Sequence, residues 1–405
     1  MLTVKTPEEV NSIIKENFDS VIGTEEIPVI DALGRVLAED IKAEEFVPAF
    51  NRSTVDGYAV IAKDCFGASA SNSIILQCVK EIKMGEIADF RLNANECAYV
   101  PTGGMLPENA DAVVMIEYTE DYGNSEIGIL KSVAPSENLI YKGEDAKPGQ
   151  SVLNAGRILN AADIGTATDM GCSVLNLIKK PLIGIISTGD ELVSPTEEIS
   201  LGQIRDVNSN LLASYAKEEG CDYICYGIVK DDEEALSLAL KKAIDECDIV
   251  LISGGSSAGV KDKTAKVIES FGELFFHGIA IKPGKPSILG KCNGKPVIGL
   301  PGHPVAAYYI SKLFVSKIIA RICGREYSER TIPAYISENI SANQGRALCV
   351  AVNLENRNGK LYAIPVRSKS GLIASIAQTD GFVLVPRSSE GVSEGGIVNV
   401  ISVLK

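Results

Sequence analysis

Carboxylates follow three apolar runs in the second half of the chain, each where a buried strand is expected to end. Glu191 lies in STGDEL after PLIGIIS, Asp231 lies in KDD after DYICYGIV, and Asp262 follows the glycine-rich stretch after DIVLIS. Since the carboxyl ends of parallel strands meet at one edge of a sheet, where ligands bind, these acids are expected to lie together. Such carboxylates can hold Mg²⁺ or orient a water molecule. Taken singly, each acid is also typical of a solvated turn or a helix cap.

The stretch SGGSSAGVKDKT at residues 253–264 matches neither of the two common phosphate-binding loops. It lacks the Gly-Lys-Ser/Thr ending of a P-loop and the glycine spacing of a dinucleotide-binding loop. Its glycines still let the backbone approach an anion, and the following helix offers unpaired N–H groups. Asp262 would repel a bare phosphate but would favour one that carries a divalent cation. The residues expected to contact a ligand here are Ser253, Gly254, Gly255, Ser257 and Gly259.

Two further segments supply groups that suit an oxyanion. In AIKPGKPSILG the prolines and the glycine restrict Lys282 and Lys285, and preordered lysines bind phosphate or a metal oxyanion well. GLPGHPVAA opens a helix, and there Pro301, His303 and Pro304 are candidate contacts, with the histidine as a possible donor. The alternatives are a solvent-exposed turn for the lysines and a structural role for the histidine.

The elements that must position these residues fall into several domains. From residue 180 to 329, strand-like and helix-like runs alternate, which predicts an α/β domain with a doubly wound parallel sheet. Residues 41–145 are typical of an inserted β-rich domain, and residues 330–405 are typical of a small C-terminal β-barrel-like domain. The fold class is therefore multidomain α/β plus β. Residues 1–40 and 146–179 are assigned to a linking domain, with helices at about 6–17, 28–36 and 159–171.

The overall composition limits the classes of partner. The 405 residues carry a formal net charge of −14, which argues against nucleic acid and membrane surfaces as partners. Only two histidines are present, and the ten cysteines include no C-x-x-C pair, so a metal is expected to be a hard cation held by oxygen atoms. No apolar run is long enough to span a bilayer and the N-terminus has no signal pattern, so we expect a cytoplasmic location.

Eight motifs together resemble the molybdopterin molybdenumtransferases, the molybdenum insertases related to the E domain of gephyrin. The resemblance extends from about residue 5 to residue 400 and keeps the family's order. Each motif alone is weak, whereas eight in order are specific. The motifs are NRSTVDGYAV, PTGGMLPENADAVV, KGEDAKPG, STGDEL, GQIRDVNSNLL, SGGSSAGVKDKT, IKPGKP and GLPGHPVAA.

The resemblance implies a transferase that binds adenylylated molybdopterin with Mg²⁺, accepts molybdate and releases AMP. It implies an elongated homodimer in which the sheet domain of one subunit faces the β-rich domain of the other, and an adenylyltransferase as the possible supplier of the substrate. Glu191 and Asp262 are then the expected Mg²⁺ ligands, and Lys282 and Lys285 would hold molybdate. Carried over by motif, the catalytic positions are Asp56, Thr102, Asp145, Glu191, Asp231 and Asp262.

Two departures from the family pattern leave the choice between molybdate and tungstate open. His303 stands where the family commonly has Asn, and Ala306 stands where it commonly has Ser. Some relatives also bind an oxyanion with C-terminal Arg and Ser residues, for which Arg346 and Ser370 are the candidates here. The alternative functions are a molybdopterin adenylyltransferase, which usually lacks the two β domains, and a gephyrin-like scaffold.

Overall fold

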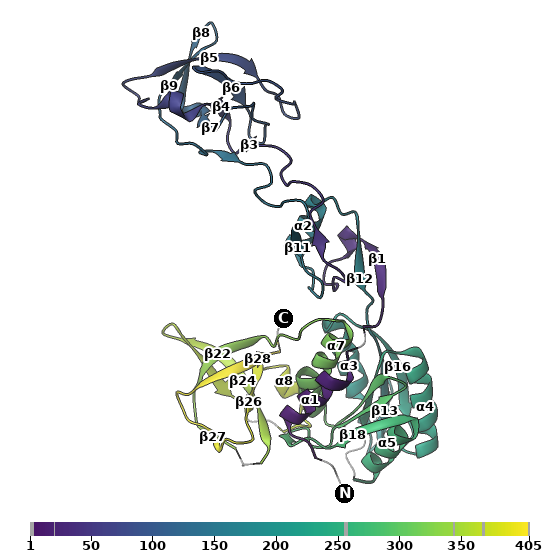
Figure 1. Cartoon of the computed structure of the whole chain (residues 1–405). Coiled ribbons are helices and arrows are strands. Elements are labelled where there is room, and N and C mark those ends of the chain that lie inside the picture. Colours follow the sequence, from purple (N-terminus) through teal and green to yellow (C-terminus); the bar gives the residue numbers. More distant parts are fainter. Residues whose placement is uncertain (1–3, 20, 255–257, 343–344, 367–368, 404–405) are drawn as a thin grey trace.

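The computed structural model describes residues 4–19, 21–254, 258–342, 345–366 and 369–403, and for residues 258–262 it describes the backbone alone. Figure 1 shows an elongated molecule with an α/β body and a β barrel side by side at one end. A β-rich module lies at the other end, and a narrow linking region joins the two ends. No helix within these described ranges is long and apolar enough to cross a membrane.

The α/β body is built on a six-stranded sheet whose first four strands are parallel. The inner strands are buried along nearly their whole length, which explains their continuous apolar sequences. The fifth strand pairs antiparallel with both of its neighbours, so the expected parallel sheet is confirmed for the first four strands but not for the last two pairings. In sheet order the strands are β16 (Asp222–Val229), β13 (Leu182–Thr188), β17 (Ile249–Gly254), β21 (Lys295–Leu300), β20 (Ile288–Cys292) and β18 (Gly272–His277).

Helices cover both faces of this sheet, and polar residues fix where two of them begin. Asp206 accepts a hydrogen bond from the Ser209 N–H at 3.1 Å and caps α3, and Asp232 accepts one from the Ala235 N–H at 2.8 Å and caps α4. The last helix runs from α6 through a π-helical turn, η4, into α7. The bounds are α3 (Val207–Glu218), α4 (Glu233–Glu246), α5 (Ala258–Phe271), α6 (Pro304–Ile310), η4 (Ser311–Val315) and α7 (Ser316–Ile322).

The N-terminal helix α1 (Pro7–Asn17) packs on the α/β body. Thr6 and Glu9 form a capping box, as the sequence predicts, and Val10 and Ile14 join the core of that body. The helix expected at 28–36 is wrong. The chain instead forms β1 (Thr24–Pro28) and a short 3₁₀ turn, η1 (Val29–Asp31), because β1 pairs antiparallel with β12 (Val174–Ile178), a partner that local sequence does not reveal.

Short strands and one helix complete the linking region. Helix α2 is capped by Asn160, and Gly171 follows it with a positive φ of 82°, as expected for a helix stop. These elements share a small apolar core of their own around Leu37, Leu159 and Leu177. The remaining elements of the region are α2 (Ala161–Asp169), β2 (Ile41–Lys42) and β11 (Ser151–Leu153), which pairs with β2.

The β-rich module contains a second six-stranded sheet, with an apolar cluster on each face. Its sheet order is β7 (Ala112–Met115), β4 (Gly57–Val60), β6 (Glu96–Val100), β5 (Ile74–Glu81), β9 (Glu126–Ile129) and β8 (Thr119–Gly123). Beside it lie the pair β3 (Arg52–Ser53) and β10 (Leu139–Ile140) and the 3₁₀ turns η2 (Ala62–Cys65) and η3 (Ile116–Tyr118).

The C-terminal region closes into a five-stranded barrel, because β24 pairs with both β25 and β26. Strand β19 (Ile281–Lys282) of the α/β body adds to β24 outside the barrel and joins the two units. The expected multidomain α/β plus β class is confirmed, whereas the domain boundaries given above stay predictions. The elements are β22 (Thr331–Ile336), β23 (Ile340–Ser341), β24 (Ala347–Arg357), β25 (Lys360–Pro365), α8 (Ile373–Ile376), β26 (Gly381–Val385), β27 (Gly391–Val392) and β28 (Ile397–Ser402).

Candidate active site

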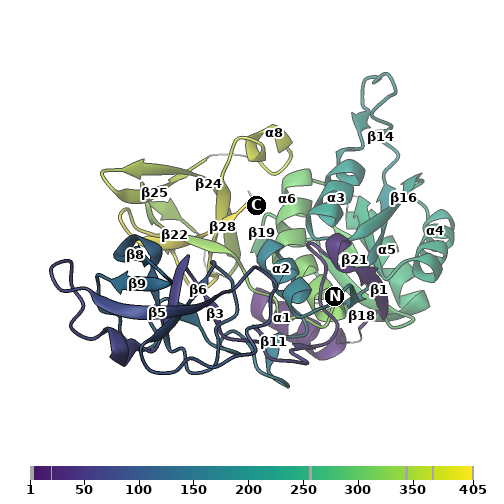
Figure 2. The same ribbon diagram turned by 90° about the horizontal axis from the view of Figure 1, so that it is seen from above.

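A cavity of about 310 Å³, here called the sheet-edge cavity, lies at the carboxyl ends of the parallel strands. It is lined by the ends of β13 and β17, by the loop after β21, by the start of α3 and by Gly371 and Ile373 of the C-terminal region. Of the predicted site residues it contains Glu191, Ser253, Gly254, His303 and Pro304. The β14 (Leu192–Val193) and β15 (Ile204–Arg205) pair forms one side, and Figure 2 shows the excursion between these strands projecting from the body.

Glycine is required where β17 enters this cavity. The φ of Gly254 is 158°, and a Cβ atom there would lie 2.0 Å from the carbonyl oxygen of Thr188 on the neighbouring strand β13. The close approach lets both strand ends line one cavity. Gly189 has a φ of 155°, and its missing side chain leaves room for the Glu191 carboxylate, whose Oε2 would lie 2.9 Å from a Cβ atom.

Asn208 connects the walls of the cavity. Its Nδ2 donates to Ser253 Oγ at 2.6 Å and to the Gly302 carbonyl oxygen at 2.9 Å, so α3 is tied to the ends of β17 and β21. Asp206 makes the cap of α3, so the Asn208 side chain is available for these contacts. The sequence does indicate that Asn208 faces inward, because it lies four residues before the buried Leu212 and so on the same apolar face of the helix.

Asp231 lies half-buried at the end of β16 in an acidic neighbourhood. Burial raises its pKa above the ordinary aspartate value; the charges of Asp190 and Glu191 act in the same direction, and Lys263 opposes them. Lys263 Nζ also donates to the Asp231 carbonyl oxygen at 2.6 Å. A bound cation would relieve this crowding of carboxylates. Across the described side chains, no group of three or more His, Cys, Asp or Glu residues has the geometry of a metal site.

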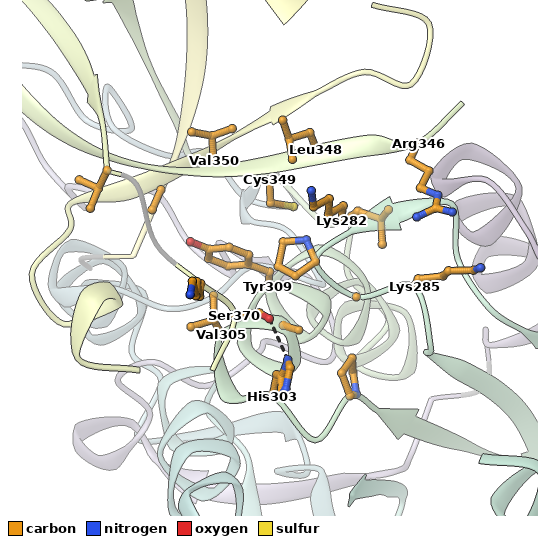
Figure 3. A pocket seen from close by; sticks show the side chains of 18 of the residues that line it. Lys282, Lys285, His303, Val305, Tyr309, Arg346, Leu348, Cys349, Val350 and Ser370 are labelled. Carbon is orange, nitrogen blue, oxygen red and sulfur yellow. Dashed lines mark hydrogen bonds between the residues drawn. The ribbon is translucent and has the colours of Figure 1, made fainter. Parts of the chain in front are cut away.

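A second cavity of about 1180 Å³, here called the interdomain cleft, lies between the α/β body and the barrel. In Figure 3, Lys282, Lys285 and Arg346 lie along one part of the cleft, and Ser370 and His303 lie along another. Pro301, also predicted, lines the cleft as well. Apart from the glycine-rich loop and Pro304, every residue that the sequence predicts for oxyanion binding therefore lines this cleft. These residues are Lys282, Lys285, Pro301, His303, Arg346 and Ser370.

The cleft's lysines come from a segment that two elements hold in place. The backbone of Lys282 pairs with Leu348 of β24, which brings the lysine against the barrel. A Cβ atom at Gly284 would lie 2.6 Å from the Ile310 side chain, so the turn between the lysines packs closely on α6. Both lysine side chains are exposed to solvent in the cleft and are able to meet an anion.

His303 stands where the two cavities adjoin. Together with Gly371 it lines both the sheet-edge cavity and the interdomain cleft. Its Nδ1 lies 2.8 Å from Ser370 Oγ, and this hydrogen bond joins the loop before α6 to the C-terminal region. A ligand in one cavity is therefore next to a ligand in the other.

The site residues predicted in the first half of the chain lie elsewhere. Asp56 Oδ1 accepts hydrogen bonds from Thr102 N at 2.7 Å and from Thr102 Oγ1 at 3.1 Å, so these two residues are brought together. They belong to the β-rich module, far from the sheet edge of the same chain in Figure 1. Asp145 lines a separate hollow of about 450 Å³ with Asp169 in the linking region.

Known proteins resemble this chain over its whole length. Family models match residues 5–171 as the MoeA N-terminal region (domain I and II), residues 184–321 as a probable molybdopterin binding domain, and residues 333–403 as the MoeA C-terminal region (domain IV). A Methanocaldococcus jannaschii protein named for molybdopterin biosynthesis is 36% identical, covering 96% of this chain and 94% of that protein. The Bacillus subtilis molybdopterin molybdenumtransferase is 31% identical, covering 99% of this chain and 95% of that enzyme.

The chain belongs to the MoeA family of molybdopterin molybdenumtransferases. A crystal structure of a molybdopterin biosynthesis MoeA protein from Pyrococcus horikoshii agrees, with a TM-score of 0.82, 37% identity and 99% of each chain covered. The family expected from the eight motifs and its transferase class are therefore confirmed.

The remaining predicted positions of this MoeA-family chain are only partly described. Gly255 and Ser257 lie outside the described residues. Gly259 and Asp262 belong to α5, where the structure gives their backbone alone. The part that Asp262 plays toward a cation or a phosphate therefore stays a prediction, as do the roles of the other site residues.

Proposed function

We propose that this chain inserts molybdate into adenylylated molybdopterin and releases AMP and the finished cofactor. The observation that carries this proposal is the meeting of Lys282, Lys285, Arg346 and Ser370 in one cleft that adjoins the sheet-edge cavity at His303. Cationic and hydroxyl groups suit a tetrahedral metal oxyanion, whereas a strand edge of this kind suits a phosphate-bearing organic ligand. Membership of the MoeA family, whose members include enzymes named molybdopterin molybdenumtransferase, supports the same reaction.

The sheet-edge cavity is proposed to bind the pyrophosphate and one ring system of the adenylylated pterin. The glycine backbone around Gly254 lets phosphate oxygens approach closely. Carboxylate oxygens suit Mg²⁺, which needs only one or two protein carboxylates when phosphates supply further ligands. Glu191 and Asp262 would hold the ion, and it would neutralise charge on the pyrophosphate.

The interdomain cleft is proposed to bind molybdate. Lys282 and Lys285 would pair with its oxygens, Arg346 would donate in a planar fork, and Ser370 would donate from the opposite side. Insertion would form two bonds between molybdenum and the dithiolene sulfurs while one molybdate oxygen leaves with the two thiol protons as water. Attack of a water molecule on the phosphoanhydride would release AMP, so both ligands must be held side by side. Proximity and charge neutralisation would supply most of the acceleration. His303 and Ala306 leave tungstate as an alternative substrate.

A homodimer would complete the site. Asp56 and Thr102 form one hydrogen-bonded pair in the β-rich module, far from the sheet edge of their own chain, which supports their use by a second subunit. Asp145 would join them.

The shared site is tested with a mixture of Asp56→Ala and Lys282→Ala chains. In a mixed dimer, one of the two shared sites combines the unaltered Asp56 of one chain with the unaltered Lys282 of the other, so the mixture should recover insertion. Failure of the mixture to recover any activity would contradict a shared site.

The function is tested by an insertion assay with purified protein, adenylylated molybdopterin, Mg²⁺ and either molybdate or tungstate. The proposal predicts AMP release that depends on the oxyanion and on Mg²⁺, with no consumption of ATP. Consumption of ATP with free molybdopterin would instead identify an adenylyltransferase. Absence of any binding of AMP or the pterin would favour a scaffold. The cytoplasmic location and delivery of substrate by an adenylyltransferase stay predictions.

A further inference from the structure

Two buried polar atoms beside the sheet-edge cavity have no hydrogen-bond partner among the described residues. They are Thr188 Oγ1 and Asn208 Oδ1. Both residues line the cavity, and their exposed fractions are only 2% and 7%. Because unpaired buried polar atoms are rare in native proteins, two at one cavity point to a ligand that supplies the missing partners.

The orientation of the Asn208 amide is fixed by its neighbours. Its nitrogen lies 2.9 Å from the Gly302 carbonyl oxygen, which can only accept a hydrogen bond, so the nitrogen must face it. Its second amide hydrogen is directed to Ser253 Oγ at 2.6 Å. The remaining atom, Oδ1, is therefore an acceptor without a donor among the described residues, and an N–H or O–H group of a ligand would satisfy it.

Phosphate and molybdate do not meet this need. Their oxygens accept hydrogen bonds, as Asn208 Oδ1 does, and two acceptors repel each other. The lining of the sheet-edge cavity balances the carboxylates of Glu191 and Asp206 against a single cation, Arg205, whereas Lys282 and Lys285 line the interdomain cleft. The surroundings of Asn208 thus favour a neutral group with a hydrogen to donate.

We infer that Thr188 and Asn208 form a recognition subsite for the polar edge of a planar nitrogen heterocycle. Asn208 Oδ1 would accept from a ring N–H or amino group, and the Thr188 hydroxyl would donate to the neighbouring ring nitrogen or carbonyl. This inference rests on the proposed function, whose substrate carries two such rings, the pterin and the adenine. A cavity of about 310 Å³ is near the lower end for small-molecule sites and suits one ring system.

The neighbouring residues Thr188 and Ser187 give a matched pair of variants. Thr188→Val keeps the shape of the side chain and removes a hydroxyl that has no partner among the described residues. Ser187→Ala removes an equally buried hydroxyl that does have one, since Ser187 Oγ lies 2.9 Å from Ser209 Oγ. The inference therefore predicts opposite results for the two variants in ligand binding and in stability.

Binding of AMP and of unsubstituted pterin is measured separately by calorimetry, and the free energy of unfolding is measured by denaturant titration. Thr188→Val should weaken the binding of one of the two rings by about 3- to 10-fold, the effect of one lost hydrogen bond, and leave stability unchanged or higher. Ser187→Ala should lower stability and leave both affinities unchanged. The probe whose affinity falls in Thr188→Val identifies the ring that the subsite binds.

The inference is overturned if Thr188→Val binds both probes as the wild type does, or if it loses stability as Ser187→Ala does. It is overturned equally if the wild-type protein binds neither ring. The insertion assay on the same wild-type preparation decides separately on the proposed function, so the two failures are distinguishable. Asn208→Ala should weaken the binding of the same ring, although this substitution also removes the hydrogen bonds to Ser253 and Gly302.

Discussion

Asp231 carries the clearest electrostatic strain among the carboxylates at the sheet edge. Its burial and the nearby charges of Asp190 and Glu191 raise its pKa, and the contact with Lys263 offsets only part of this effect. A carboxylate that disfavours its own charge is typical of a functional position, because a bound cation or substrate then restores the balance.

Asp231→Asn should stabilise the free protein at neutral pH. Because the pKa of Asp231 is raised in the folded state, the native protein keeps the Asp231 proton to a higher pH than the unfolded chain does. The free energy of unfolding therefore falls as the pH rises from the unfolded-state pKa to the folded-state pKa of this group. The gain should therefore shrink as the pH approaches the ordinary aspartate pKa of about 3.9. Denaturant titrations at several pH values measure it.

The control for this prediction is Asp222→Asn, an exposed residue at the opposite end of the same strand, β16. It changes the net charge equally and should show no such pH-dependent gain. A loss of stability in Asp231→Asn at neutral pH would contradict the electrostatic account.

At the residue scale the sequence predicted the charged groups better than the buried polar groups. Lys282, Lys285, Arg346 and Ser370 were found through motifs and family resemblance, and the structure gathers them in one cleft. Thr188 was missed, since nothing in STGDEL distinguishes a buried unpaired hydroxyl from an exposed one. Burial depends on which strands become neighbours, and a single motif does not contain that information.

At the scale of elements, the cavity depends on how closely β13 and β17 approach each other at their ends. The contact between Gly254 and the Thr188 carbonyl oxygen leaves no room for a side chain. Gly254→Ala should lower the free energy of unfolding by about 2 kcal/mol or more, since the strand ends must separate or strain, and should impair ligand binding. Denaturant titration and calorimetry with AMP measure the two effects.

The same substitution at Gly165 serves as its control. This glycine lies inside α2, and no atom lies within 4 Å of the point that its Cβ atom would occupy, so Gly165→Ala should stabilise the protein by about 0.5–1 kcal/mol. Equal and small effects of the two substitutions would show that the close approach at Gly254 is unimportant.

The order and type of the elements in the α/β body were predictable, because alternating apolar runs and amphipathic helices have distinct periods. Two errors have physical causes. The expected helix at 28–36 is replaced by the end of β1, the turn η1 and an isolated bridge at Val36, because β1 pairs with β12, about 150 residues later. The reversed direction of β20, which makes its pairings with β21 and β18 antiparallel, was not readable, since a buried strand has the same apolar sequence in either direction.

At the scale of the whole molecule, two cavities with different chemistry adjoin at His303. The sheet-edge cavity offers glycine backbone, carboxylates, one cation and neutral polar atoms without described partners, whereas the interdomain cleft offers Lys282, Lys285 and Arg346. We assign the organic substrate to the first cavity and the metal oxyanion to the second. Sequence motifs could not separate these cavities, because the barrel that forms one wall of the cleft is contributed by a later part of the chain.

The most direct test of this division measures the binding of AMP and of molybdate separately by calorimetry. The proteins compared are the wild type, Lys282→Ala and, as a control, Lys241→Ala, which changes an exposed lysine of α4. We predict that Lys282→Ala weakens molybdate binding by roughly 10-fold or more, the loss of a charged hydrogen bond, and leaves AMP binding unchanged. Unchanged molybdate binding, or an equal loss for both ligands, would contradict the division into two sites.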